Sequence, residues 1–543
     1  MSPLRHGSET LELAAGQSLF DYADNLHMRV PTSCGRSGDC HECIVEVKRG
    51  AGALSPPTDA ERFLLNDRYR LACQAFIEDP GADVEFAVLR RQPQILTSGL
   101  RRAVPLDPLT TRQGDEVFFG GRRLDRYRGR ILGLAIDAGT TTVVLNLVDL
   151  ESGDVLHTGS FENPQRFGGS DVMRRITYDG GQYRGELQQV MLSAVNFEIG
   201  EAVRQLKVRR RQIYEAVVVG NSTMRDIFFG IDVQPIGERP YRSVTETGVL
   251  NGERETTALN VTAGELGLRI FPDANVYGGP LIGSHVGADV AADLLAVGLD
   301  EEDEVVALVD VGTNTEVVVG NRGRMIAASC PAGPAFEGGE VTFGMPGYDG
   351  AIETARLVDG TVDYTTIGGA PAEGLCGSGL VDLLAELVRT GTMNELGVLE
   401  GGRDEFVVAP ERGITLSRAD LSALAQAKAA NYCGQHIVLR DYGTPVDRVA
   451  RLYLAGGFAN YIDIENAIRI GFIANLPVEK IVKVGNAALE GATIMLVSGR
   501  KRGEIERLAA GIEHVELETA PDFFDLFVEG CQFKPMEPFA PEG

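Results

Sequence analysis

Two stretches of the chain share one order of apolar and polar positions. The first reads ILGLAIDAGTTTVVLNLVDLESGDVL from Ile131, and the second reads VVALVDVGTNTEVVVGNRGRM from Val305. In each, an apolar run ends in an aspartate, Asp137 or Asp310, and a turn of glycine and hydroxyl residues leads into a second apolar run. Short apolar runs separated by a polar turn predict β-hairpins. The repeat predicts two similar lobes that face one cleft.

The rest of the chain divides into regions that differ in their hydrophobic pattern and in the elements it predicts. From residue 131 onward, runs rich in Val, Ile and Leu alternate with helical stretches such as residues 185–206, which is typical of an α/β fold. The first 90 residues instead hold short alternating strands, a short helix that Ser18 can cap, and a capping box of Thr58 and Glu61. We therefore predict four parts: a compact α+β domain (1–90), a linker (91–130), a first lobe (131–300) and a second lobe (301–543).

The predicted linker has an unusual charge. Residues 91–130 contain nine arginines against four acidic residues, together with three prolines, in a chain that is otherwise acidic. Such a segment is typical of a solvated connector. Its charge also fits an arm that docks on the chain's own acidic domain or on an acidic partner.

Composition excludes several classes of partner. The 543 residues are 44% hydrophobic, enough for two to four domains with sizeable cores. A formal net charge of −26 at pH 7 predicts repulsion of nucleic acid and of anionic membrane surfaces. The chain has no run of 18 apolar residues and no apolar signal-peptide core near its start. We therefore predict a cytoplasmic protein without a membrane span.

Four of the eight cysteines form a pattern of their own, and they are Cys34, Cys40, Cys43 and Cys73. Three lie within ten residues in a glycine-containing loop, and the fourth lies 30 residues beyond Cys43. Four thiolates converging from such a loop suit iron or zinc. A structural zinc site usually pairs two short Cys-x-x-Cys motifs. One such motif with a remote fourth cysteine is similar to the plant-type 2Fe-2S pattern, here with one extra loop residue. The sequence favours 2Fe-2S over zinc or unrelated thiols.

The neighbours of these cysteines have simpler interpretations. Gly35 and Gly38 let backbone amides approach a cluster closely and donate hydrogen bonds that set its potential. His41 is expected to be an exposed loop residue rather than a ligand. The remaining cysteines are expected to be buried thiols that pack as small hydrophobic residues; they are Cys330, Cys376, Cys433 and Cys531.

The hairpin turns carry residues suited to a nucleotide. A carboxylate, a close backbone turn and hydroxyls suit hydrated Mg²⁺ and phosphate oxygens. The candidate residues are Asp137, Gly139, Thr140, Thr141 and Thr142 in the first turn, Asp310, Gly312, Thr313 and Asn314 in the second, and the pair Gly456 and Gly457, where a flat base can lie against bare backbone. No Walker A or G-x-G-x-x-G motif accompanies them. Each piece alone also fits an ordinary α/β turn. Together they resemble the superfamily of acetate and sugar kinases, heat-shock chaperones and actin (ASKHA).

An iron–sulfur domain followed by such a fold resembles the reductive activators of corrinoid enzymes. The resemblance extends from about residue 10 to the C-terminus. The blocks that carry it are NPQRFGGSDVMRRI (163–176), VVVGNSTMRDIFFG (217–230), VGADVAADLLA (286–296), CPAGPAFEGGEVTFGMPGYDGAI (330–352), GLCGSGLVDLL (374–384), LAQAKAA (424–430) and VGNAALEGA (484–492). It implies an α+β ferredoxin-like β-grasp 2Fe-2S domain followed by a two-lobed α/β ASKHA ATPase fold.

The resemblance also implies an activity. An ATP-dependent activator would pass an electron from its 2Fe-2S cluster to the inactive Co(II) corrinoid of a methyltransferase or a cobalamin-dependent methionine synthase, restoring Co(I). The superfamily pattern implies ATP and Mg²⁺ as further cofactors, with Asp137 and Thr140–Thr142 at phosphate and metal. Asp310 and Thr313 would orient the second hairpin and the attacking water, and Gly456 and Gly457 would contact adenosine. A homodimer is expected, because relatives of this fold often pair.

Three other functions fit parts of the sequence. The first alternative is an electron carrier whose ASKHA part is a catalytically silent scaffold that only binds a corrinoid protein. The chain can also be a small-molecule kinase with an electron-carrying appendage, although no sugar- or acetate-binding constellation stands out. It can activate a radical dehydratase, although the plant-type cysteine loop argues against the bridging 4Fe-4S cluster usual there.

Overall fold

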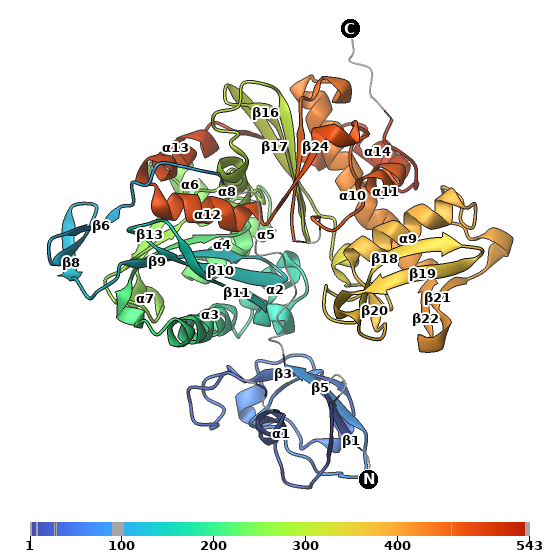
Figure 1. The fold of residues 1–543 in the computed structure, drawn as a ribbon, viewed down its shortest axis with the longest axis horizontal. Coiled ribbons are helices and arrows are strands. Elements are labelled where there is room, and N and C mark those ends of the chain that lie inside the picture. The colour runs from blue at the N-terminus through green and yellow to red at the C-terminus, as the bar shows by residue number, and fades with distance from the viewer. Residues whose placement is uncertain are drawn as a thin grey trace.

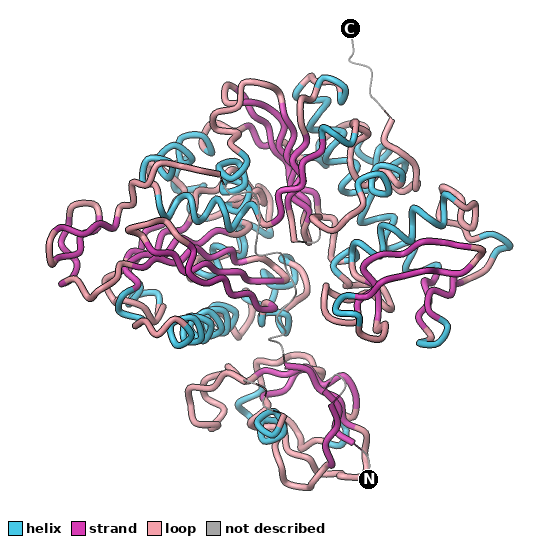
Figure 2. The backbone as a smooth tube through the Cα atoms, viewed as in Figure 1, coloured by secondary structure: helices cyan, strands magenta, loops and turns pink. Residues whose placement is uncertain are grey.

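The computed structural model describes residues 3–6, 9–26, 28, 30–88, 102–457 and 459–537. An N-terminal domain lies below two larger lobes (Figure 1). Helices and strands alternate through both lobes, whereas strands and loops dominate the N-terminal domain (Figure 2). None of the helices in the described ranges is both long and apolar enough to cross a membrane.

The N-terminal domain is a five-stranded β-grasp sheet beside one helix. The sheet order is β2-β1-β5-β3-β4, with β1 parallel to β5 and the other pairs antiparallel. Its elements are β1 (Pro3–His6), β2 (Glu9–Glu12), α1 (Leu19–Asn25), β3 (Ile44–Arg49), β4 (Tyr69–Leu71) and β5 (Val84–Val88). The predicted caps are confirmed. The hydroxyl of Ser18 accepts from the N–H of Asp21 at 3.1 Å, and the N–H of Thr58 donates to Glu61 at 2.8 Å, opening a short 3₁₀ turn.

The two lobes have matching sheets, as the repeated hairpins predict. The orders are β11-β10-β9-β12-β14-β13 and β24-β23-β15-β16-β17-β25. In each lobe the first strand pairs antiparallel with the second and parallel with a later strand. The strands are β9 (Leu132–Ala138), β10 (Thr142–Asp149), β11 (Val155–Glu162), β12 (Ile213–Val219), β13 (Leu259–Thr262) and β14 (Asn275–Gly278), then β15 (Val306–Val311), β16 (Thr315–Asn321), β17 (Arg324–Cys330), β23 (Leu452–Ala455), β24 (Ile481–Gly485) and β25 (Glu513–His514).

Helices cover both sheets, and smaller sheets extend the second lobe. Among the helices are α2 (Val172–Asp179), α3 (Glu186–Gln205), α4 (Ser222–Phe229), α8 (Ala288–Val297), α9 (Gly377–Arg389) and α10 (Arg418–Tyr442). The shorter helices are α5 (Gln234–Gly237), α6 (Val244–Leu250), α7 (Ala263–Leu266), α11 (Ile464–Arg469) and α14 (Phe523–Gly530). The outer strands of the second lobe are β18 (Ala351–Val358), β19 (Thr361–Thr366), β20 (Gly374–Leu375), β21 (Glu405–Ala409) and β22 (Ile414–Ser417).

The predicted range of the second lobe, 301–543, includes two helices that belong to the first. Helix α12 (Ala487–Val497) packs on α8 and β9, and α13 (Gly499–Ala509) follows on the same side. Nearly the whole of α12 is apolar and buried, so it needs cover on all sides. The first-lobe sheet and α8 supply that cover, which draws the chain back across the cleft.

Of the predicted linker, 91–130, residues 102–130 lie within the described ranges and residues 91–101 lie outside them. Its described part forms a small antiparallel sheet of β6 (Thr110–Gln113), β7 (Glu116–Phe119) and β8 (Arg122–Arg126). Just before this sheet, Arg102 pairs with Asp300 at 2.5 Å and with Glu301 at 2.8 Å. The segment therefore docks on the chain's own first lobe, which is one of the alternatives that its basic composition raises.

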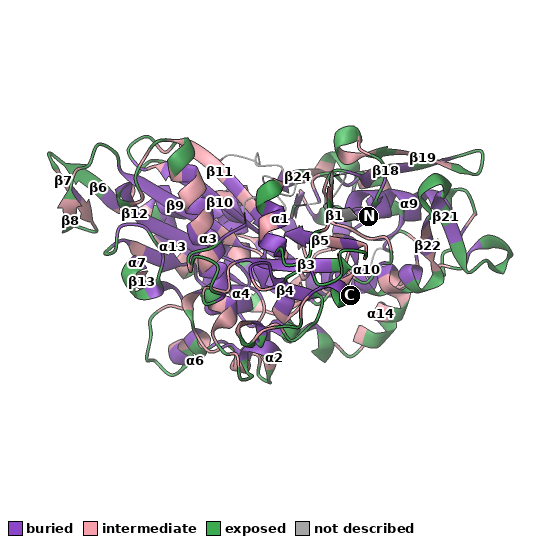
Figure 3. Ribbon diagram, turned by 90° about the horizontal axis from the view of Figure 1, so that it is seen from below, coloured by how far each residue is buried: buried purple, intermediate pink, exposed green. Residues whose placement is uncertain are grey.

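The N-terminal domain packs against the underside of the first lobe. Phe63 meets Phe167 edge-on at 5.4 Å, and Phe167 meets Tyr178 at 5.5 Å. Apolar side chains from both domains form one continuous buried cluster. Strands β3 and β5 of the N-terminal domain include buried segments, drawn purple in the view from below (Figure 3). The domain is thus held against α2, α3 and the short turn between β11 and α2.

Candidate functional site

The four predicted cysteines converge in the N-terminal domain as two pairs. The sulfurs of Cys43 and Cys73 lie 3.4 Å apart and both residues are buried. Cys34 and Cys40 are half-buried, and the Cys40 thiol and amide both donate to Cys34. Within the described ranges, no three His, Cys, Asp or Glu side chains converge as a single-ion site. Two pairs suit two metal centres better than one tetrahedral zinc ion.

The loop between these cysteines stabilises thiolates. Burial opposes ionisation of Cys34, but hydrogen bonds from Ser37, from Cys40 and from the Gly38 amide outweigh it and lower the pKa of the thiol to about 5. The hydrogen bond from Cys43 lowers the pKa of Cys73 to about 7. Gly38 has a φ of 95°, and a Cβ there would lie 3.0 Å from Ala60. The glycine and the donated amides fit a cluster of anionic sulfurs, as the sequence predicts.

His41 differs from the prediction of an exposed loop residue. Only 18% of its side chain is exposed. Its ring stacks on Phe63 at 4.0 Å, and its Nδ1 lies 2.8 Å from Glu186 at the start of α3. The neighbouring carbonyl of Cys40 accepts from Gln189 of α3 at 3.4 Å. The prediction was wrong because the first lobe covers this loop, which local sequence cannot reveal.

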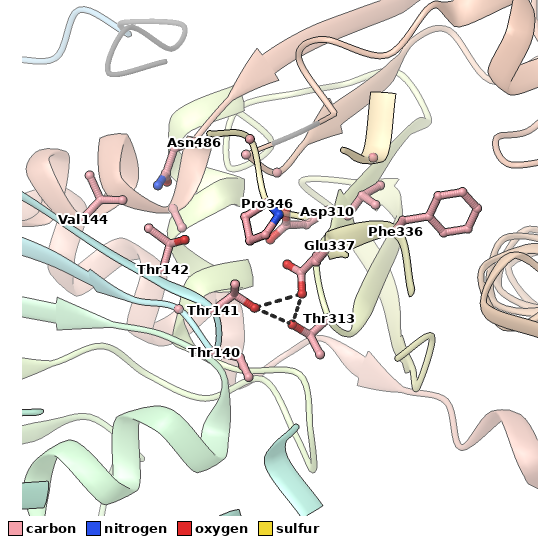
Figure 4. A pocket seen from close by; sticks show the side chains of 18 of the residues that line it. Thr140, Thr141, Thr142, Val144, Asp310, Thr313, Phe336, Glu337, Pro346 and Asn486 are labelled. Atoms are coloured by element: carbon pink, nitrogen blue, oxygen red, sulfur yellow. Dashed lines mark hydrogen bonds between the residues drawn. The ribbon is translucent and has the colours of Figure 1, made fainter. Parts of the chain in front are cut away.

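All of the residues predicted to bind nucleotide line one cleft between the lobes (Figure 4). They come from the β9–β10 turn, the β15–β16 turn and the loop after β23. Gly456 has a φ of 107°, and a Cβ there would lie 2.1 Å from the Val311 carbonyl. A Cβ on Gly457 meets no other atom within 4 Å, so this residue leaves open space for a flat ligand. Their role in nucleotide binding stays a prediction.

Three successive backbone carbonyls of the β9–β10 turn accept hydrogen bonds from the segment 163–175. The carbonyl of Gly139 accepts from the Asn163 side chain at 2.8 Å, and that of Thr141 accepts from the Asn163 amide at 2.8 Å. The carbonyl of Thr140 accepts from the fully buried Arg175 at 2.7 Å. The turn is therefore fixed by the 163–175 segment, which also carries Phe167 to the N-terminal domain.

The two hairpins are joined across the cleft. The hydroxyls of Thr141 and Thr313 lie 3.2 Å apart, and both donate to the Glu337 carboxylate (Figure 4). Asn486, ahead of α12, donates to Asp137 at 2.8 Å. Sequence reasoning missed Glu337 and Asn486, although both lie in blocks that carry the family resemblance.

The cleft concentrates carboxylates. Burial, with repulsion from Asp310, raises the pKa of Asp137 to about 7 and that of Asp289 to about 8. Burial likewise raises the pKa of Asp310 to about 6. Sequence reasoning missed Asp289, which lies in the first turn of α8 and within the block 286–296 that carries the family resemblance. Oxygen ligands that repel one another in a buried cleft are suited to a hard divalent cation.

Of the other four cysteines, Cys376 lines the cleft between the lobes, whereas Cys330, Cys433 and Cys531 are not among its lining residues. Cys330, Cys376 and Cys433 are buried, as predicted, and Cys531 is half-buried. Burial raises the pKa of Cys330 and of Cys376, so these thiols stay protonated and pack as apolar groups.

Comparison with known proteins gives matches over the N-terminal domain and over both lobes. A family model described as the RACo middle region matches residues 132–302, and one described as the C-terminal domain of RACo, the ASKHA domain, matches residues 304–541. A model of the 2Fe-2S iron–sulfur cluster binding domain matches residues 5–78. The chain belongs to the RACo family. Like the family, it joins a 2Fe-2S domain to a two-lobed ASKHA fold.

Relatives of this RACo-family chain span nearly its whole length. It is 27% identical to the corrinoid activation enzyme RamQ of Eubacterium limosum, over 97% of this chain and 98% of the relative. It is 22% identical to a Co(II) methylated amine-specific corrinoid protein reductase of Methanosarcina barkeri, over 73% and 76% of the two chains. A solved structure of a reductive activator for corrinoid, iron–sulfur protein covers 99% of both chains with 28% identity and a TM-score of 0.72.

Proposed function

We propose that this protein is an ATP-dependent reductive activator of a corrinoid protein. It would transfer an electron from its 2Fe-2S cluster to inactive Co(II) corrinoid and restore Co(I). The observation that carries the proposal is that one chain combines four converging cysteines, a first lobe that packs continuously on their domain, and the two-hairpin cleft. The RACo family and the full-length relatives described as a corrinoid activation enzyme and a reductive activator support the same activity.

ATP turnover would supply the free energy that an uphill electron transfer to Co(II) requires. Plant-type clusters have potentials near roughly −400 mV, which does not reach the low potential of base-on Co(II). In a one-electron transfer each ~59 mV uphill costs about tenfold in the equilibrium. Binding of the partner coupled to ATP turnover would change the ligation of the cobalt and make the transfer favourable.

Different residues of the cleft would contact different parts of the nucleotide. Asp137 and Thr140–Thr142 would face phosphate and Mg²⁺, while Asp310 and Thr313 would orient the second hairpin and the attacking water. Asp289, which lines the same cleft, would offer Mg²⁺ a further oxygen ligand. Gly457, with open space above it, would accept the adenosine base.

The finer assignments extend the proposal. The partner would be a corrinoid-binding protein that serves a methyltransferase or a cobalamin-dependent methionine synthase. The acidic chain would act in the cytoplasm and as a homodimer, without nucleic acid or membrane. The upstream electron donor is left open by the residues.

Substitution of Asp310 by Ala tests the nucleotide part. We expect Asp310→Ala to abolish ATP-dependent Co(II)-to-Co(I) conversion, followed anaerobically by absorbance, while the cluster absorbance is unchanged. The matched control is Asp303→Ala, at an exposed acidic residue of the same lobe. Full activity of Asp310→Ala contradicts the assignment. Phosphate release with and without the corrinoid partner separates an ATPase from a silent scaffold, since the scaffold releases none.

A further inference from the structure

One carboxylate, that of Glu337, satisfies hydroxyl donors from both lobes. Thr141 of the first lobe donates to its Oε2 at 2.9 Å, and Thr313 of the second lobe donates to the same oxygen. Figure 4 shows the three side chains pointing toward one another inside the cleft. Glu337 therefore ties the two hairpins together across the cleft.

A terminal phosphate oxygen needs the same partners. It is anionic and accepts hydrogen bonds, as the carboxylate does. A threonine hydroxyl has one proton to donate, so Thr141 and Thr313 cannot serve Glu337 and a phosphate together. The fully buried Arg175, which holds the Thr140 carbonyl at 2.7 Å, also attracts the negative charge of Glu337. The same cation would attract a phosphate that replaces the carboxylate.

We propose that Glu337 determines nucleotide specificity by standing in for the terminal phosphate. A nucleoside triphosphate must displace its carboxylate from Thr141 and Thr313, whereas a diphosphate leaves it in place. The inference rests on the proposed function, because it assumes that a nucleotide places its last phosphate between the hairpins. Glu337 thus weakens triphosphate binding and closes the lobes again after the phosphate leaves.

The loop that follows Glu337 lies between the cleft and the N-terminal domain. Met345 and Pro346 line the nucleotide cleft on one side and a second cavity on the other. That second cavity is also lined by Lys48 and Val88 of the N-terminal domain. A Cβ on Gly338 would lie 2.4 Å from the Met345 amide nitrogen, so the loop is tightly folded. Displacement of Glu337 therefore shifts the wall that faces the N-terminal domain.

Binding measurements on the full-length, iron-loaded chain test the inference. Affinities for a non-hydrolysable ATP analogue and for ADP are measured by calorimetry in Glu337→Gln, in Glu337→Asp and in the unsubstituted chain. The neutral amide accepts weaker hydrogen bonds and does not repel phosphate, so we expect Glu337→Gln to bind the analogue about tenfold more tightly with ADP unchanged. Glu337→Asp keeps the charge on a shorter side chain and should gain less. Glu340→Gln, at an exposed position of the same loop, is the control and should change neither affinity.

The outcomes separate the possible roles. Tighter binding of the analogue alone supports the inference. Weaker binding of the analogue in Glu337→Gln, as a metal ligand would give, overturns it, and so does an equal gain for ADP. Lost turnover with unchanged analogue affinity also overturns it, since a catalytic base would behave in that way. If the unsubstituted chain binds neither nucleotide, the proposed function fails and the inference fails with it.

Discussion

A single hydroxyl at the junction of the N-terminal domain and the first lobe offers a direct test of how the two are coupled. The hydroxyl of Tyr178 donates to the Phe63 carbonyl at 2.6 Å, and both residues are buried. Phe63 in turn stacks on His41, which follows Cys40, one of the four predicted cluster ligands. Substitution of Tyr178 by Phe keeps the ring that packs on Phe167 and removes only this hydrogen bond.

The cost of that removal can be estimated. In the docked domain the Phe63 carbonyl would stay buried without a donor, whereas in the undocked domain water would solvate it. An unsatisfied buried polar group costs about 1–3 kcal/mol. Since about 1.4 kcal/mol corresponds to a factor of ten, the docking equilibrium should weaken roughly fivefold to a hundredfold.

Amide hydrogen exchange followed by mass spectrometry measures this shift. Peptides that cover Cys40 to Phe63 should exchange faster in Tyr178→Phe by the same factor, because exchange of docked amides reports the open population. The cluster absorbance should not change. Tyr183→Phe is the matched control, because Tyr183 stacks on Tyr178 and its hydroxyl makes no hydrogen bond within the described ranges. Equal exchange rates in Tyr178→Phe and the unsubstituted chain would refute the reasoning.

Three further predictions address the sites and their support. Cys73→Ser should leave less than two irons per chain by iron and sulfide assay, and a full complement would argue against Cys73 as a ligand. Arg70→Met should lower the free energy of unfolding of the N-terminal domain by about 3–5 kcal/mol, because it leaves the buried Glu61 carboxylate, 2.8 Å from Arg70, without its ion pair. Thermal bleaching of the cluster absorbance measures this loss. An unchanged midpoint temperature of bleaching contradicts the prediction. Asp289 has a pKa of about 8 in the fold, raised by burial and by Asp310 from an ordinary 3.8, so the folded state binds its proton more tightly. Stability should therefore fall as pH rises from about 4 to about 8, by up to about 1.4 kcal/mol per pH unit, and Asp289→Asn should flatten the slope of melting temperature between pH 6 and 8.

Local sequence was sufficient to predict features whose interacting residues lie close together in the chain. The hairpins followed from apolar runs around Asp137 and Asp310, because strands and tight turns are fixed by neighbouring residues. The caps at Ser18 and Thr58 followed for the same reason. The cysteine spacing indicated a cluster domain, since three of the four predicted ligands lie in one loop.

Tertiary structure decided what lies far apart in sequence. The carboxylates of Asp289 and Glu337 join the cleft only because α8 and the loop after β17 fold back onto the hairpins. Helix α12 returns to the first lobe because its apolar surface needs cover that the second lobe does not give. His41 lost its expected exposure for a related reason, since the first lobe covers the cluster loop. Short-range pattern fixes elements and their chemistry, whereas burial between distant segments fixes which side chains share a site.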